Sequence, residues 1–227
     1  MRGDITVMIS VAIDGPAGAG KSSLARKAAA QLGFIYVDTG ALYRTVGLKF
    51  SKMGADTELK CDIASVLAET TVDIRFVNGE QRVYLDGEDV SAEIRTPVAS
   101  MMASAVSAKS EVRAFLLEMQ RKLARENDVL MDGRDIGTVV LPNATVKIFL
   151  TASAEERARR RYDELIANGM NVTFKEVYDD MVQRDYADSH REIAPLKQAD
   201  DAVLADTTGL EPEQSLELIL NIVKERI

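Results

Sequence analysis

The sequence contains a single cysteine, Cys61, and a single histidine among its 227 residues. One thiol cannot form an intramolecular disulfide, which is typical of a protein from a reducing compartment. A zinc site made of cysteine and histidine is also excluded, because such sites need three or four of these ligands. We therefore interpret Cys61 as a buried structural thiol rather than a nucleophile.

Basic residues are outnumbered, with 28 Lys and Arg against 36 Asp and Glu, which gives a formal net charge of −8. Nucleic acid is therefore not expected as a partner, because duplex binding that is independent of sequence requires a basic surface. No apolar run reaches the length of a membrane span. The first apolar stretch ends at Asp14 without the small-residue cleavage site of a secretory signal. We expect a monomeric cytoplasmic protein with small-molecule partners and no membrane contact.

Apolar segments alternate between strand-like and helix-like patterns from the start of the chain. An apolar, β-branched run at 5–13 predicts a buried strand, and a helical pattern follows at 21–31. A second strand at 34–37 and a helix at 41–53 repeat the order, which indicates a parallel α/β sheet. Three later strands are predicted at 129–131, 145–150 and 201–208. The sequence therefore predicts an α/β fold with a five-stranded parallel sheet.

The pattern changes after residue 55, which predicts an insertion into the parallel core. Apolar residues alternate on both sides of Asn78-Gly79, and this combination is a strong signal for an antiparallel hairpin. Thr96 and Pro97 are typical of a helix N-cap followed by proline at the first helical position. Helical patterning continues to residue 126, with a break at 109–110.

A second excursion from the core follows the strand at 145–150. Ser153 with Glu156, and Thr173 with Glu176, each match the capping-box pattern of a helix start. We predict a helical, arginine-rich region at 151–192, which we expect to form a lid, and an insert at 56–108. The remaining segments, 1–55, 109–150 and 193–227, form the predicted core domain.

The segment "GPAGAGKS" matches the phosphate-loop pattern G-x-x-x-x-G-K-[ST] in full. It follows a predicted strand and opens a predicted helix, so backbone N–H groups and the helix N-terminus can hold the phosphates of ATP. Lys21 is expected to reach the transferring phosphoryl group, and Ser22 to bind Mg²⁺, with Asp132 holding the ion through water. The predicted ATP site consists of Gly15, Pro16, Ala17, Gly18, Ala19, Gly20, Lys21, Ser22 and Ser23.

A phosphate loop alone does not separate a kinase from a nucleotide-dependent switch or motor. The guanine-reading pattern N-K-x-D is absent, and the switch-like "DTTG" at Asp206 lies near the end of the predicted core. The strand at 129–131 leads into one acidic residue, Asp132, and then into "GRD". These features disfavour a GTPase switch and an ATPase motor, which stay as alternative functions.

Four arginines lie within five residues in "ERARRR", at 157, 159, 160 and 161. Phosphoryl transfer needs several cations around the moving group, and a closing lid would supply them while excluding water. Arg157 and Arg161 are our predicted catalytic arginines. The alternative is a solvated helix face that pairs with neighbouring acids, which is our interpretation of Arg159.

Further arginines stand beside aspartates or hydroxyls in "DTGALYR", "DGRD" and "RDYADSHR". Arg44, Arg134 and Arg191 from these segments are candidates to hold the phosphate of an acceptor. The alternative for each is an ordinary surface salt bridge, which contributes little to stability.

These segments, together with "LDGEDVSAEIRT", "VKIFLTAS" and "APL", resemble the bacterial cytidylate kinases, a family of nucleoside-monophosphate kinases. The resemblance covers nearly the whole chain. It implies a core, an insert that binds the monophosphate and a mobile lid. The implied reaction is transfer of the γ-phosphoryl group of ATP to CMP, and also to dCMP, with Mg²⁺. A kinase acting on UMP as well as CMP is the alternative within the class.

The resemblance also implies roles for individual residues. Those implied to hold the CMP phosphate are Thr39, Arg44, Arg134 and Arg191. Those implied to read cytosine are Ser104, Arg113 and Asp135, and those implied to contact the ribose are Arg184 and Asp188. Asp135 suits this role chemically, because a carboxylate accepts from the N4 amino group of cytosine and repels the O4 of uracil. Relatives carry Gly-Thr at Ser22-Ser23, so either serine is a candidate Mg²⁺ ligand.

Overall fold

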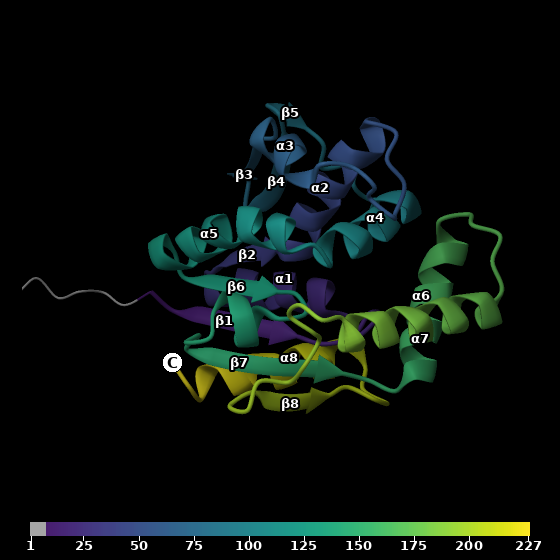
Figure 1. The fold of residues 1–227 in the computed structure, drawn as a ribbon. Coiled ribbons are helices and arrows are strands. Elements are labelled where there is room, and N and C mark those ends of the chain that lie inside the picture. The colour runs from purple at the N-terminus through teal and green to yellow at the C-terminus, as the bar shows by residue number, and fades with distance from the viewer. Residues whose placement is uncertain (1–7) are drawn as a thin grey trace, which may run out of the picture.

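The computed structural model describes residues 8–227, and a five-stranded parallel sheet lies at its centre (Figure 1). The strands are β1 (Ser10–Asp14), β2 (Ile35–Asp38), β6 (Val129–Asp132), β7 (Val146–Thr151) and β8 (Val203–Asp206), in the spatial order β2-β6-β1-β7-β8. Every neighbouring pair is parallel, which confirms the predicted fold class. The first strand begins at Ser10, and residues 5–7 of its predicted span lie outside the described residues.

Helices cover both faces of this sheet, which explains why its strands read as continuous apolar runs. Val11 and Ile13 of β1 pack in one buried cluster with α1 (Lys21–Leu32) and α8 (Pro212–Lys224). Ala12 points the other way and packs beside α5 (Ser110–Glu126) and a short π-helix, η1 (Ile136–Val140).

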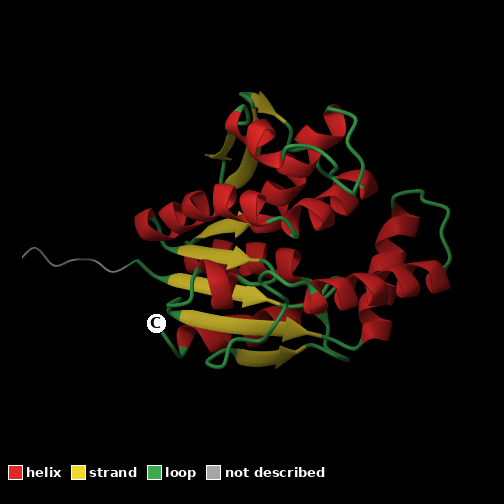
Figure 2. Cartoon of the chain, in the orientation of Figure 1, coloured by secondary structure: helices red, strands yellow, loops and turns green. Residues whose placement is uncertain are grey.

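The insert contains the predicted hairpin, formed by β3 (Val72–Val77) and β4 (Glu80–Leu85), and both elements are visible in Figure 2. Asn78 and Gly79 both have positive φ angles, 53° and 79°, as a two-residue hairpin turn of type I′ requires. The helix predicted after Thr96 is α4 (Pro97–Ser107), and its break before α5 is confirmed. The sequence did not predict the short third strand, β5 (Glu88–Asp89), or α3 (Ile63–Ala68). The prediction that Cys61 is buried was wrong, because this residue lies in an exposed segment just before α3.

The hydrophobic cluster of the insert also includes the helices next to it. Phe50 of α2 (Thr39–Lys52) and Leu116 of α5 are both fully buried in this cluster with Val83 of β4. Gly47 lets α2 approach α4 closely, because a Cβ atom there would lie 2.9 Å from Met102 Cβ. The insert is therefore packed directly onto α2, which begins at the end of β2.

The second excursion consists of α6 (Ala154–Ala167) and α7 (Phe174–His190), which pack against each other beside the carboxyl ends of the strands (Figure 1). Open α/β sheets bind ligands at this edge. The capping box predicted at Thr173 is complete. None of the helices within residues 8–227 combines the length and hydrophobicity needed to cross a membrane.

The capping box predicted at Ser153 is only half formed, so that prediction was wrong in part. Ser153 Oγ accepts from Glu156 N at 3.3 Å, but Ser153 N donates to Thr208 Oγ1 at 2.9 Å. The Glu156 carboxylate accepts instead from Gly209 N. The loop after β8 reaches the start of α6 and provides both substitute partners, a long-range contact that the local pattern does not contain.

Asp14, at the end of β1, fixes the loop that follows β6. Its two carboxylate oxygens accept hydrogen bonds from Ile136 N and Gly137 N, both at 2.7 Å. Burial raises the pKa of Asp14 to about 6, against the opposing effect of these two hydrogen bonds. The same contact orients the "DGRD" segment immediately before η1.

We predict that Asp14 makes folding stability fall as the pH rises from about 4 to about 6. The folded protein holds this proton more tightly than the unfolded chain does in that range, so deprotonation costs up to about 3 kcal/mol. Urea unfolding across this range, compared between the wild type and Asp14→Asn, measures the contribution. An equal pH slope in both proteins would contradict the raised pKa.

Candidate active site

The phosphate loop connects β1 to α1 and is closely packed against the second excursion. Gly18 has φ 73°, and a Cβ atom there would lie 3.0 Å from the Arg157 carbonyl oxygen and 2.7 Å from Met181 Cε. Gly20, with φ 81°, is the N-cap of α1. Both positions therefore require glycine, in a loop whose backbone turns around a space at the helix N-terminus.

Lys21 is the buried cation of this loop. Its Nζ atom donates to Pro16 O at 2.7 Å, and the residue is only 5% exposed. Burial, followed by the charge of Arg134, lowers the pKa of Lys21 well below its ordinary value, although Asp132 and Asp14 oppose this. A bound phosphate would favour the charged ammonium, which is the role the phosphate-loop pattern predicts.

Asp132, at the end of β6, connects three segments of the site. Its carboxylate accepts from Ser22 Oγ and from Tyr36 OH, each at 2.9 Å, and its backbone carbonyl accepts from Thr39 Oγ1 at 2.8 Å. Burial and then the charge of Asp38 raise the pKa of Asp132 to about 6. A serine hydroxyl and a carboxylate thus lie together at the start of α1, as hard oxygen ligands suited to Mg²⁺.

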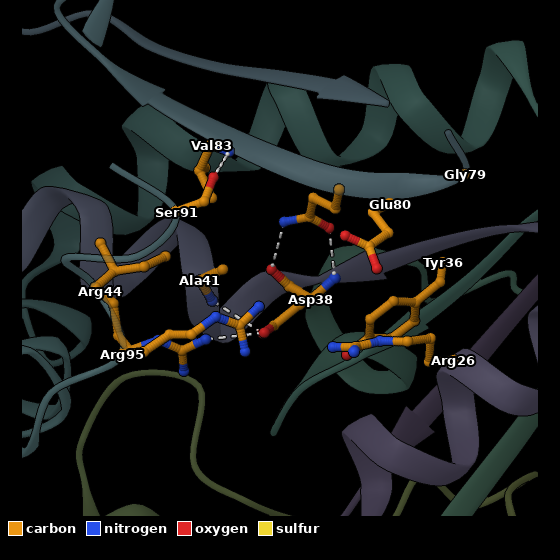
Figure 3. A pocket seen from close by; sticks show the side chains of 12 residues that line it. Arg26, Tyr36, Asp38, Ala41, Arg44, Gly79, Glu80, Val83, Ser91 and Arg95 are labelled. Atoms are coloured by element: carbon orange, nitrogen blue, oxygen red, sulfur yellow. Dashed lines mark hydrogen bonds and ion pairs between the residues drawn. The ribbon is translucent and has the colours of Figure 1, made fainter. Parts of the chain in front are cut away.

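The arginines predicted to hold an acceptor phosphate each form an ion pair with a carboxylate. Arg44 Nη2 lies 2.8 Å from Asp38 Oδ2, in the cavity drawn in Figure 3. Arg134 Nε lies 3.0 Å from Asp188 Oδ2. These pairs are partly or largely buried, so the alternative of an exposed surface salt bridge does not describe them.

Arg184 lies among these arginines without a carboxylate of its own. Its Nε atom is buried and has no hydrogen-bond partner among the described residues. Burial, and then the charge of Arg134, lowers the pKa of Arg184; the charges of Asp188 and Asp180 oppose this, and Arg44 adds a smaller lowering effect. Three guanidinium groups therefore stand within electrostatic range of one another beside a buried donor, which is an arrangement suited to an anion.

Asp135 is the centre of a second buried ion-pair cluster. It is paired with Arg113 and, at 3.3 Å, with Arg191 Nη2. Burial raises the pKa of Asp135, and the two arginines oppose that effect. Ser104, also predicted to contact the base, lies on the same helix, α4, as Ser107, whose carbonyl accepts from Arg113 Nη1 at 3.2 Å.

The arginines of α6 lie in different environments. Arg157 is buried, and its guanidinium donates to Ala17 O at 2.8 Å and to Asp185 Oδ2 at 2.5 Å. Arg161 is half-exposed and paired with Glu164 at 2.7 Å. Arg159 is exposed, as predicted, but it lies over the ring of Phe174, 4.4 Å from its centroid, and forms no ion pair with the neighbouring acids among the described residues.

Three residues that the site uses were not singled out by the sequence. Asp185 accepts from Ala17 N at 3.1 Å as well as from Arg157, so it ties α7 to the phosphate loop. Ser107 accepts from Arg191 Nη1 through its hydroxyl at 3.4 Å. Tyr36 holds Asp132. Helical spacing in "RDYADSHR" places Asp185 three residues before Asp188, and this was the only local signal available.

Comparison with known proteins identifies relatives of similar length. A model of the cytidylate kinase family matches residues 11–225. A cytidylate kinase from Caldicellulosiruptor bescii is 50% identical over 214 residues, which cover 94% of this chain and 95% of the relative. Another, from Geobacter sp. strain M21, is 51% identical over 221 residues, or 96% and 94% of the two chains.

Solved structures with the same fold are more distant in sequence. An uncharacterized protein from Eubacterium ventriosum has a TM-score of 0.55 at 14% identity, over 96% of this chain and 99% of that protein. A gluconokinase from Sinorhizobium meliloti has a TM-score of 0.50 at 12% identity, over 97% and 94%. These two likenesses concern the fold alone, whereas the family model and the close relatives span almost the entire sequence. The chain belongs to the cytidylate kinase family.

Proposed function

We propose that this protein transfers the γ-phosphoryl group of ATP to CMP, and also to dCMP, giving ADP and the nucleoside diphosphate. The observation that carries the proposal is a second set of largely buried arginines, Arg44, Arg134 and Arg191, each paired with an aspartate, in addition to the phosphate loop. A hydrolytic switch has no need of such a second anion site. Membership of the cytidylate kinase family supports the same reaction. We also propose that the protein acts in the cytoplasm as a monomer.

The donor side consists of the phosphate loop and Lys21. Backbone N–H groups at the start of α1 bind the phosphates of ATP, and the ammonium of Lys21 moves from Pro16 O to the transferring group. Ser22 and Asp132 would hold Mg²⁺, and we prefer Ser22 to Ser23 because its hydroxyl already contacts the Asp132 carboxylate. The ion supplies positive charge that neutralises the phosphate oxygens.

On the acceptor side, the CMP phosphate replaces carboxylates as the partner of buried arginines. Arg44, Arg134 and Arg191 exchange Asp38, Asp188 and Asp135 for phosphate oxygens, and Thr39 adds a hydroxyl. Arg184 uses its free Nε donor toward the ribose, together with Asp188. Since the arginines are already buried and oriented, little further ordering is needed when the acceptor binds.

Base recognition is assigned to Asp135, with Arg113 and Ser104 completing the contact. The carboxylate accepts from the N4 amino group of cytosine, and the O4 of uracil would face the same negative charge. These contacts are made to the base alone, so recognition of the base is the same for CMP and dCMP.

The proposed lid, residues 151–192, has two parts with different tasks. Arg157 holds the phosphate loop in shape through Ala17 and Asp185, so its contribution to catalysis is positional in this arrangement. Arg161 leaves Glu164 on closure and adds positive charge to the transferring group. Closure also excludes water, which favours transfer to CMP over hydrolysis. The other proposed units are the insert at 56–108 and the core.

The function is tested by ADP formation from ATP with and without a monophosphate acceptor. We expect CMP and dCMP to stimulate ADP production strongly and UMP to stimulate it poorly. A switch or motor would consume ATP or GTP equally well without an acceptor, and that result would overturn the kinase assignment.

We predict that Lys21→Ala and Arg161→Ala lower kcat by roughly 100- to 1,000-fold, because both cations act on charge that develops in the transition state. KM for CMP should change much less. Arg159→Ala is the matched control on α6 and should leave kcat near the wild-type value. Arg191→Ala should raise KM for CMP instead. An unchanged kcat for Arg161→Ala would make Arg161 a surface residue.

We predict that Asp135→Asn lowers the ratio of kcat/KM for CMP to that for UMP by roughly 5- to 150-fold, which corresponds to about 1–3 kcal/mol. The amide keeps the shape of the side chain and can donate to O4. The variant also leaves Arg113 and Arg191 without their buried counter-charge, so we expect a lower Tm. Equal loss on both acceptors, with the ratio unchanged, would restrict Asp135 to a structural role.

A further inference from the structure

Among the described residues, the hairpin of the insert is hydrogen-bonded to the end of β2 through the side chain of Gln81 on β4. Gln81 Oε1 accepts from Asp38 N at 2.8 Å, and Gln81 Nε2 donates to Asp38 O at 3.2 Å. Dashed lines at Asp38 in Figure 3 mark these bonds. The carboxamide thus satisfies both backbone groups of one residue, as a neighbouring strand would do.

Asp38 is the residue through which this contact reaches the acceptor side. Its Oδ1 accepts from Ala41 N at 2.9 Å and so caps α2, while its Oδ2 holds Arg44 at 2.8 Å. Thr39, the next residue, is bonded to Asp132. The backbone position of Asp38 therefore sets the start of α2 and the direction of Arg44 together.

Arg44 must release Asp38 when it binds a phosphate, if the function proposed above holds. The Asp38 carboxylate then loses its cation and keeps only the helix cap. The two Gln81 bonds do not involve that carboxylate, so they hold the Asp38 backbone in place during the exchange. They also connect the hairpin to the phosphate-binding arginine, because movement of β4 would displace Asp38.

We propose that Gln81 is a positioning residue for the acceptor phosphate, acting through Asp38 on Arg44. A neutral carboxamide is required there, because it alone among the side chains of that length presents one acceptor and one donor without charge. A glutamate would keep the bond from Asp38 N, lose the bond to Asp38 O, and add negative charge beside the Asp38 carboxylate. This inference rests on the assignment of Arg44 to the acceptor phosphate.

The first test compares Gln81→Ala with Glu80→Ala, the neighbouring position in the same strand and cavity. We expect KM for CMP to rise about 3- to 30-fold in Gln81→Ala, as the loss of one or two hydrogen bonds implies, with KM for ATP unchanged. Gln81→Glu should raise KM for CMP further. Glu80→Ala should match the wild type. A parallel rise in both KM values would indicate a general structural defect and overturn the proposal.

The second test is a double-mutant cycle with Arg44→Ala. Because Gln81 is proposed to act through Arg44, Gln81→Ala should have less than about a 2-fold effect on KM for CMP once Arg44 is absent. Fully additive effects would overturn the proposal. If Gln81→Ala does not fold, Gln81→Met replaces it, since methionine preserves the packing and lacks both hydrogen bonds.

The two tests separate this inference from the proposed function. A wild-type protein that forms no ADP in response to CMP would overturn the function itself. A wild-type protein that responds to CMP, with an unchanged KM in both Gln81→Ala and Gln81→Met, would overturn only the role of Gln81.

Discussion

The hydrogen bonds to Asp132 are the contacts on which the rest of the site depends. This aspartate is the last residue of β6, which lies between β2 and β1 in the sheet. Its carboxylate accepts hydrogen bonds from Ser22 of α1 and Tyr36 of β2, and its backbone carbonyl accepts one from Thr39 of α2. The phosphate loop and the start of α2 are therefore both hydrogen-bonded to the same residue. Its burial costs free energy in the charged form, which raises its pKa, and the charge of Lys21 together with the hydrogen bonds from Ser22 and Tyr36 offsets part of that cost.

A similar arrangement of buried charge governs the acceptor side. Arg44, Arg134 and Arg191 are kept in place by aspartates, so no arginine is left as an isolated buried cation. In the proposed function, a phosphate competes with those aspartates for the same guanidinium groups. This explains how a protein with a net charge of −8 can present a concentrated anion site. Whether a site binds an anion depends on the charges around it, whereas the net charge describes the protein as a whole.

Contacts between separate parts of the chain connect the two sides to the elements around them. Asp185 and Arg157 join α6 and α7 to Ala17 in the phosphate loop, and Met181 packs against the same loop. On the other side, Gln81 joins the hairpin to Asp38. Each excursion is therefore hydrogen-bonded to the backbone of a loop or strand end that carries residues of the candidate site.

The sequence by itself determined the fold class and most of the elements, because strand burial, hairpin turns and helix caps are local patterns. The Asn78-Gly79 turn and the cap at Thr173 formed as predicted, and the first strand formed at Ser10–Asp14, which shares 10–13 with its predicted span. The family resemblance, carried by segments such as "LDGEDVSAEIRT", was confirmed by relatives that match almost the full length. The assigned roles of individual site residues stay predictions.

Only the tertiary structure decided which polar side chains meet. Ser153 formed half of its predicted cap, because Thr208 and Gly209 arrive from a loop more than fifty residues away. Asp185 and Gln81 bond to the backbone of Ala17 and Asp38, and a backbone partner leaves no trace in the residue types that a sequence pattern can detect. Interactions between residues close in the chain can be predicted from the sequence, whereas contacts between distant residues depend on how the sheet brings distant segments together.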